Sequence, residues 1–166
     1  LKAFVRTNCP QKYEMYCGNE EYLDKILALG MGLNLKKRRK DYINASQILS
    51  MIDFYFDEMY KIEDEFRFGE ETVNRVLRLF AAKYDYEDDS NTWFNKVKEV
   101  AGECGFAREM SDYKADPQAY KGSVSDVAEI IRIAVTGRRN SPDLWSIMKI
   151  MGSERSLARI RRITEE

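Results

Sequence analysis

The residues of this chain that could do chemistry gather in three charged clusters, two basic and one acidic. The first cluster is a run of consecutive cations: Lys36, Lys37, Arg38, Arg39 and Lys40. Such a run neutralises phosphates, and each contact releases counterions and makes the affinity depend on salt. The alternative interpretation of this run is a solvated connector between helices.

The second basic cluster lies near the C-terminus. Arg132 stands within an otherwise apolar run, where an unpaired buried charge is costly, so its side chain either reaches the surface or is held for a partner. Arg138 and Arg139 follow, and residues 141–143 begin a further helix with free backbone N–H groups. A helix N-terminus beside two arginines suits a phosphate or the edges of bases. Asp143 favours the bases, because a carboxylate opposes a purely phosphate-binding role.

The third cluster is acidic and comprises residues 62–65 and 85–89. Paired carboxylates can hold a divalent cation, but the spacing of a calcium-binding loop is absent. A solvated acidic surface is therefore the favoured interpretation. The net charge of −1 comes from 27 basic and 28 acidic side chains, and it combines an acidic middle with a basic C-terminal third. We expect any polyanion to bind toward the ends of the chain.

The chain contains no histidine, and this absence excludes several kinds of catalytic centre. It rules out Ser/His/Asp and Cys/His nucleophilic sites and His-ligated zinc. Cys9, Cys17 and Cys104 form no CxxC pair, and we expect three reduced thiols in a cytosolic protein. The sequence therefore predicts no catalytic residue and no metal site, and it points to a binding function.

Helices must position these clusters, because helical periodicity dominates the sequence. Nine glycines and three prolines favour long uninterrupted elements. No stretch shows the alternation of a strand, so we predict an all-α fold. The apolar stripes predict helices over residues 20–30, 44–60, 70–84, 90–102, 123–136, 142–151 and 153–163.

The ends of these helices carry recognisable signals. Helix starts are predicted at Asn44, which forms a capping-box pattern with Gln47, at Asp89 or Ser90, at Ser123, and at Pro142 as a first-turn residue. Gly137 occupies the position of a left-handed C-terminal cap. These signals frame the second basic cluster as a loop between two helices.

The organisation along the chain predicts two small helical subdomains. We expect residues 1–30 to be the remnant of a preceding domain, 31–110 to form the first subdomain and 111–166 the second. No apolar run approaches the roughly 20 residues of a membrane span. The chain begins with Leu1, and we expect it to be a C-terminal piece of a longer protein.

Three segments of the last third carry a resemblance to a known family: RIAVTG (132–137), SPDL (141–144) and MGSERSLARI (151–160). They resemble the C-terminal anticodon-binding region of bacterial glutamyl-tRNA synthetases, and residues 41–58 and 93–106 resemble more divergent parts of it. The resemblance implies a monomeric cytoplasmic parent enzyme that uses ATP and Mg²⁺ to attach glutamate to tRNA. This piece lacks the catalytic domain, so we expect it to bind tRNA without cofactors and not to aminoacylate.

The resemblance also implies roles for individual residues. Arg132, Ser141 and Leu144 match positions that contact anticodon bases in the family, and Ser141 keeps the hydroxyl of the usual Thr. Further anticodon contacts are assigned to Arg138, Arg139 and either Arg38 or Arg39, and phosphate positioning to Lys36, Lys37, Lys40 and Arg155. Ser153 stands where the family has a Lys, a departure that weakens a phosphate contact.

Two alternatives remain beside this interpretation. A helical protein–protein module would bind a partner chain through the apolar stripes and arginines, without RNA specificity. A second possibility keeps the RNA but extends its identity to glutamine tRNA. The residue that faces the last anticodon base, Arg38 or Arg39, would decide between discriminating and non-discriminating binding.

Overall fold

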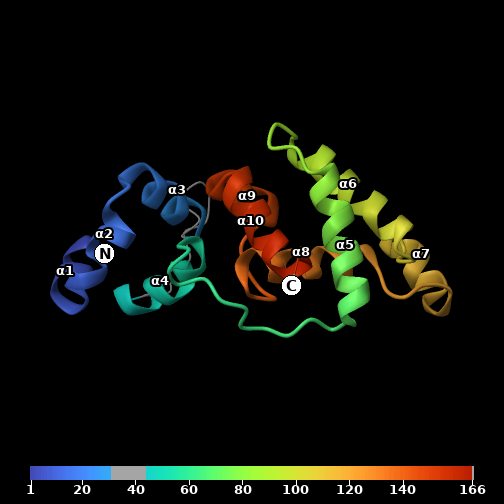
Figure 1. The fold of residues 1–166 in the computed structure, drawn as a ribbon, viewed down its shortest axis with the longest axis horizontal. Coiled ribbons are helices and arrows are strands. Elements are labelled where there is room, and N and C mark those ends of the chain that lie inside the picture. The colour runs from blue at the N-terminus through green and yellow to red at the C-terminus, as the bar shows by residue number, and fades with distance from the viewer. Residues whose placement is uncertain (31–43, 166) are drawn as a thin grey trace. The chain divides into compact units, whose positions relative to one another are not determined.

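A computed structural model of the chain describes residues 1–30 and 44–165 (Figure 1). Within these ranges the regular elements are helices, and the one strand-like feature is an isolated parallel bridge between Ala107 and Ser123. The predicted all-α fold is thereby confirmed. The basic run at residues 36–40 lies outside the described residues. No helix in the described ranges is long and apolar enough to cross a membrane.

The chain divides into two compact units, Leu1–Lys61 and Ile62–Glu166. This division differs from the expected one, because the boundary predicted between residues 110 and 111 falls within the second unit. The reason is that α6 packs against α8, and the backbone of Ala107 bonds to Gly122 at 2.9 Å, so the segment after α6 stays attached. Each unit is described by itself.

The first unit consists of short helices joined by aromatic contacts. Its elements are α1 (Lys2–Asn8), η1 (Pro10–Lys12), α2 (Tyr13–Cys17), α3 (Glu20–Gly30), α4 (Ala45–Ile52) and η2 (Asp53–Tyr55). The capping box of Asn44 and Gln47 is confirmed, with Asn44 Oδ1 accepting the Gln47 N–H at 2.9 Å.

The helix expected over residues 44–60 is wrong in its length, because α4 ends at Ile52. A single 3₁₀ turn follows, and Phe56 is extended. Tertiary contacts replace the helical ones here: the Tyr22 hydroxyl donates to the carbonyl oxygen of Tyr55 at 2.6 Å, and the Tyr16 hydroxyl donates to Asp53. Hydrogen bonds from tyrosines distant in the sequence thus override the local helical pattern.

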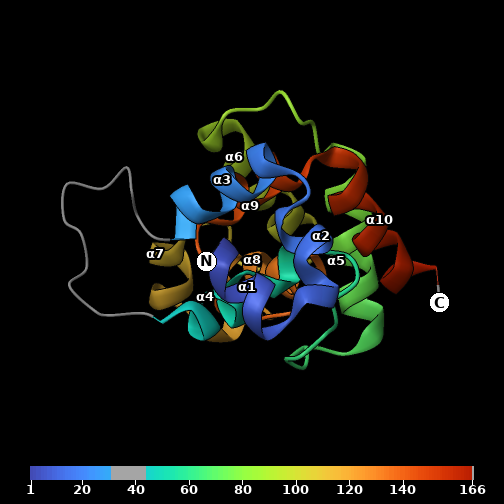
Figure 2. The ribbon, with the colours of Figure 1, turned by 90° about the vertical axis from the view of Figure 1, so that its left-hand side faces the viewer.

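The second unit is built around one central helix. Its elements are α5 (Glu70–Lys83), α6 (Ser90–Glu103), α7 (Met110–Ala115), η3 (Pro117–Ala119), α8 (Val124–Thr136), α9 (Leu144–Met151) and α10 (Ser153–Thr164). Helix α8 packs against α5, α6 and α10, as two perpendicular views show (Figures 1 and 2). The predicted burial of most of α8 is confirmed by its eight buried residues.

Most helix ends in this unit follow the predicted signals. Asp89 caps α6 by accepting the Thr92 N–H at 2.7 Å, and Gly137 ends α8 with φ of 78°. Pro142 is a correction, since Asp143 is the N-cap of α9 and Pro142 precedes the helix. A second correction concerns Phe94, which belongs to the apolar stripe predicted for residues 90–102 and was expected to be buried. In the structure this residue is 38% exposed.

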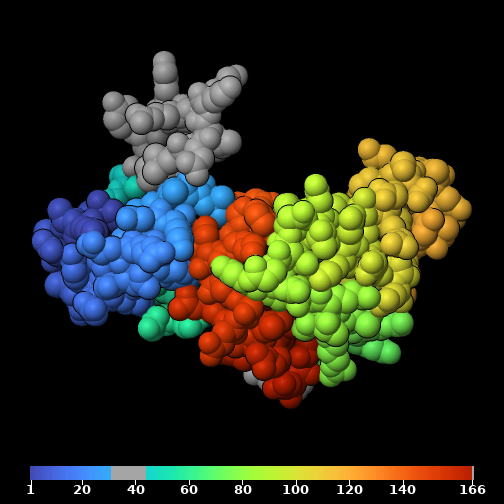
Figure 3. All heavy atoms as spheres, turned by 90° about the horizontal axis from the view of Figure 1, so that it is seen from above, coloured from blue at the N-terminus to red at the C-terminus, as the bar shows by residue number. Residues whose placement is uncertain are grey.

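The turn between α5 and α6 is attached to α9. The Trp145 indole N–H donates to the carbonyl oxygen of Asp88 at 3.0 Å, and Lys149 donates to the carbonyl oxygen of Tyr86. In the space-filling view the atoms of this turn lie against those of α9 (Figure 3). This attachment fixes the outer side of α9, the helix that directly follows the loop of the second basic cluster.

Candidate nucleic-acid interface

Arg132 lies on α8 one turn before its end and is half-buried. Its Nη1 donates to the carbonyl oxygen of Pro142 at 2.7 Å, to that of Ser141 at 3.3 Å and to the Ser141 hydroxyl. Burial lowers the pKa of this guanidinium, while Asp143 and Glu129 favour its charged form. The side chain therefore neither simply reaches water nor stands unpaired, because the following loop supplies its acceptors.

The loop that holds Arg132 comprises residues 137–143, and we call it the arginine loop. The Thr136 hydroxyl lies 2.8 Å from the carbonyl oxygen of Arg132 and accepts the Arg138 N–H at 3.1 Å. The Ser141 hydroxyl donates to the Pro142 carbonyl oxygen at 2.9 Å. A buried threonine and a left-handed glycine thus set the start of the loop, and Arg132 fixes its end.

Arg138 and Arg139 of the arginine loop contact acids that sequence analysis treated as a solvated surface. Arg138 Nε lies 3.0 Å from Glu63 Oε2, and the Arg139 N–H donates to Asp64 Oδ2 at 2.7 Å. Arg139 Nη2 also donates to the carbonyl oxygen of Glu65 at 3.0 Å. We call residues 63–65 the acidic segment. Its docking on the arginine loop overturns the interpretation of these acids as merely solvated.

Backbone hydrogen bonds and a second carboxylate strengthen this docking. The carbonyl oxygen of Gly137 accepts the N–H groups of Glu63 at 2.8 Å and Asp64 at 3.1 Å. Glu129, on α8, lies 3.4 Å from Arg139 Nε and 3.2 Å from Arg67 Nε. The predicted interface is therefore a region of alternating charge and not a uniformly basic patch.

The remaining predicted residues differ in their surroundings. Leu144 is 1% exposed at the start of α9, so its side chain packs in the core of the unit. Arg155 is half-buried in the first turn of α10. The structure thus brings Arg132, Ser141, Arg138 and Arg139 together, and the proposed RNA contacts of all these residues stay predictions.

Sequence analysis did not identify Arg159 as a buried residue that connects two helices. Arg159 is 2% exposed and donates from Nη1 to the carbonyl oxygen of Val135 at 2.7 Å, which joins α10 to the end of α8. The available signal was its register, because the buried face of α10 comprises Ser156, Arg159, Ile160 and Thr164 at helical spacing. A charged residue on that face had to find its acceptors inside the unit.

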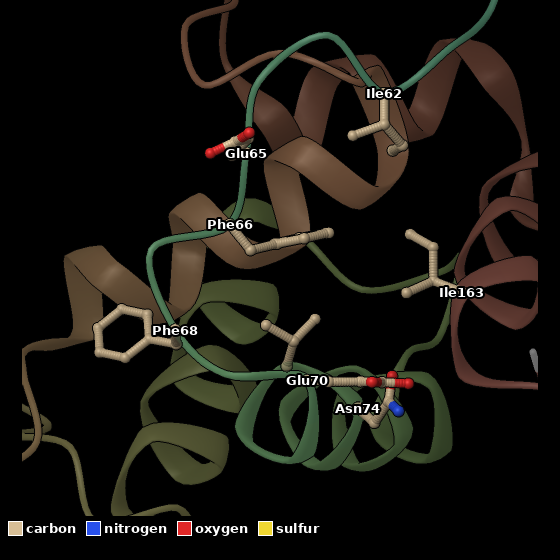
Figure 4. A pocket seen from close by; sticks show the side chains of 8 residues that line it. Ile62, Glu65, Phe66, Phe68, Glu70, Asn74 and Ile163 are labelled. Carbon is tan, nitrogen blue, oxygen red and sulfur yellow. The ribbon is translucent and has the colours of Figure 1, made fainter.

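A shallow cavity of about 500 Å³ lies beside the acidic segment. Figure 4 shows Ile62, Phe66 and Ile163 around its opening, and Glu65 and Glu70 also line it. Two carboxylates at an apolar cavity repel phosphate, so this cavity is a poor site for an RNA backbone. In the described ranges, this cavity included, no group of three or more His, Cys, Asp or Glu residues is arranged to hold a metal ion.

The second unit is all-helical in the described ranges, and it holds the Arg132 guanidinium and the Ser141 hydroxyl together at a loop before a helix. A model of the anticodon binding domain family matches residues 8–164, and the chain belongs to this family. It is similar to a glutamate–tRNA ligase of Acetivibrio thermocellus, with 43% identity over 147 residues, which are 87% of this chain and 27% of that protein.

Two further relatives carry the same name. The glutamate–tRNA ligase of Clostridium perfringens strain 13 is 38% identical over 130 residues, which are 75% of this chain and 24% of that protein. The glutamate–tRNA ligase of Sorangium cellulosum is 36% identical over 139 residues, which are 81% of this chain and 24% of that protein. The chain therefore spans about a quarter of the length of the curated relatives it matches.

Proposed function

We propose that this chain recognises the anticodon of a glutamate tRNA as the C-terminal part of a glutamate–tRNA ligase. The observation that carries the proposal is the family match over residues 8–164, together with relatives named as glutamate–tRNA ligases. In this proposal, ATP and Mg²⁺ serve the catalytic part of a monomeric cytoplasmic enzyme, and this chain contributes binding alone.

The geometry of Arg132 supports a role in reading bases. Its guanidinium already donates to carbonyl and hydroxyl acceptors of Ser141 and Pro142, and the exocyclic carbonyl of a base offers the same acceptor chemistry. A base inserted beside the arginine loop can exchange with one of these acceptors and leave the remaining ones in place. Unstacked anticodon bases are suited to this, because single-stranded loops expose their hydrogen-bonding edges.

The Ser141 hydroxyl is the second proposed contact. It bonds to Arg132 and to the Pro142 carbonyl oxygen, so both its position and its rotamer are set before RNA arrives. Leu144 supports the loop indirectly, since its buried side chain fixes the first turn of α9, which directly follows the arginine loop. Preorganised donors of this kind discriminate between bases by about 1–3 kcal/mol for each good contact.

The test is fluorescence-anisotropy binding of the 166-residue chain to a glutamate tRNA transcript. The controls are transcripts that differ in single anticodon positions, including the glutamine anticodon, at low and physiological salt. We expect selective loss of affinity with altered anticodons. Equal binding that depends on salt alone would contradict anticodon reading, and no binding at low salt by a folded chain would favour the protein–protein alternative.

A further inference from the structure

The guanidinium groups of the arginine loop are attached to carboxylates of the same chain. Arg138 Nε and Glu63 Oε2 are 3.0 Å apart, and the two side chains are 20% and 41% exposed. A solvated lysine or arginine gains affinity for any RNA by taking a phosphate and releasing counterions. An arginine already bonded to a carboxylate must first give up that contact.

The acidic segment is held in place independently of this ion pair. Two backbone N–H groups, those of Glu63 and Asp64, donate to the Gly137 carbonyl oxygen, and Asp64 accepts the Arg139 N–H. These backbone hydrogen bonds thus position the Glu63 carboxylate beside Arg138, and they do not depend on the charge of that carboxylate. Glu129 supplies the corresponding carboxylate near Arg139.

We propose that Glu63 is a specificity-determining residue, whose carboxylate holds Arg138 and limits sequence-independent binding of RNA phosphates at the arginine loop. The proposal rests on the function proposed above. Binding of a correct anticodon gains base contacts through Arg132 and Ser141 and needs no phosphate on Arg138. Binding of any other RNA depends on phosphates, so the same carboxylate weakens wrong complexes more than right ones.

The size of the effect follows from the exposure of the pair. A partly exposed ion pair is weak, so RNA phosphate can displace it, but each displacement costs affinity. We therefore expect Glu63→Gln to raise affinity for a transcript with an altered anticodon about two- to fivefold at low salt. The slope of log affinity against log salt should steepen by about one, as for one added phosphate contact. Affinity for the correct transcript should rise less, so discrimination falls.

Two variants make this test specific. Glu87→Gln removes the same charge from the exposed turn between α5 and α6, where the Glu87 carboxylate forms no ion pair with an arginine of the described ranges. It should leave affinity within about twofold of wild type, because solvent and salt screen an exposed unpaired charge. The double variant Glu63→Gln/Arg138→Gln should return the altered-anticodon affinity to the wild-type value or below, because the gain requires Arg138. Circular dichroism of each variant checks that the gain comes from a folded chain, since the basic side chains of an unfolded chain also bind RNA phosphates.

The outcomes separate the inference from the proposed function. If wild type discriminates between anticodons and Glu63→Gln produces no gain, or no larger gain than Glu87→Gln, the role of Glu63 is refuted while anticodon reading stands. A gain that persists in the double variant likewise refutes it. If the wild-type chain does not discriminate at all, both the proposed function and this inference fail.

Discussion

Arg132 and Arg159 are two arginines of the same helical unit, and both donate to backbone carbonyl oxygens that lie in different surroundings. Arg159 on α10 is 2% exposed and donates to the Val135 carbonyl oxygen inside the unit. Arg132 on α8 is half-buried and donates to the arginine loop, whose Asn140 is exposed. The comparison teaches that the place of the acceptors matters together with burial. The acceptors of Arg132 lie in a partly exposed loop, where a ligand can replace them, whereas the Val135 carbonyl oxygen lies inside the unit.

The largest expected effect is on stability, from Arg159→Ala. This change removes the donor to Val135 and leaves a cavity between α8 and α10, so the free energy of unfolding should fall by about 3 kcal/mol. Urea denaturation followed by circular dichroism measures it. Discrimination between anticodons by the molecules that remain folded should stay close to wild type.

The matched change at Arg132 should show the opposite pattern. Arg132→Ala should reduce the discrimination between correct and altered anticodons by about 2 kcal/mol, close to thirtyfold. The free energy of unfolding should fall by about 1 kcal/mol, because the acceptors that lose this donor are partly exposed and water can replace it. Arg132→Lys keeps the charge without the planar fork and should recover affinity but little discrimination.

The comparison would break if the two effects were exchanged. A large loss of stability in Arg132→Ala with unchanged anticodon preference would make Arg132 a purely structural residue. A loss of discrimination in Arg159→Ala at full stability would extend the interface into α10.

A smaller effect on stability is expected at Gly137, which ends α8 and begins the arginine loop. Gly137→Ala places a side chain at φ of 78°, which costs about 1 kcal/mol of unfolding free energy. The control Gly30→Ala has nothing within 4 Å of the added methyl group and lies in a helix, so it should not lower the free energy of unfolding. If Gly137→Ala did not lower it either by urea denaturation, the cap would not constrain the arginine loop.

Long helices were predictable from the sequence because their signals are local. The stripe of Val73, Val76, Leu77 and Phe80 and the caps at Asp89, Ser123 and Gly137 each involve residues a few positions apart. The end of α4 at Ile52 was not predictable in this way. It depends on Tyr22, a residue distant in sequence whose hydroxyl donates a hydrogen bond to the Tyr55 carbonyl oxygen.

The candidate site was predictable in its residues and not in its connections. Arg132, Ser141 and both arginines of the loop were found from residue types and from the resemblance, and the structure gathers them at the end of α8. The acidic segment was missed because Glu63 and Arg138 are 75 positions apart, and no periodicity links them. Arg159 was missed because a buried arginine looks like any exposed one until its register on the helix is considered.

The two hydrogen bonds at the Gly137 carbonyl oxygen have a consequence for the timing of solvent exchange. The amide protons of Glu63 and Asp64 share one acceptor, although the side chain of Glu63 is exposed. Both amides should therefore exchange slowly with deuterium and should begin to exchange together when the acidic segment lifts from the arginine loop. The exchange rates of these two amide protons therefore report whether the acidic segment is docked on the arginine loop, in the free and the RNA-bound protein, without a chemical label.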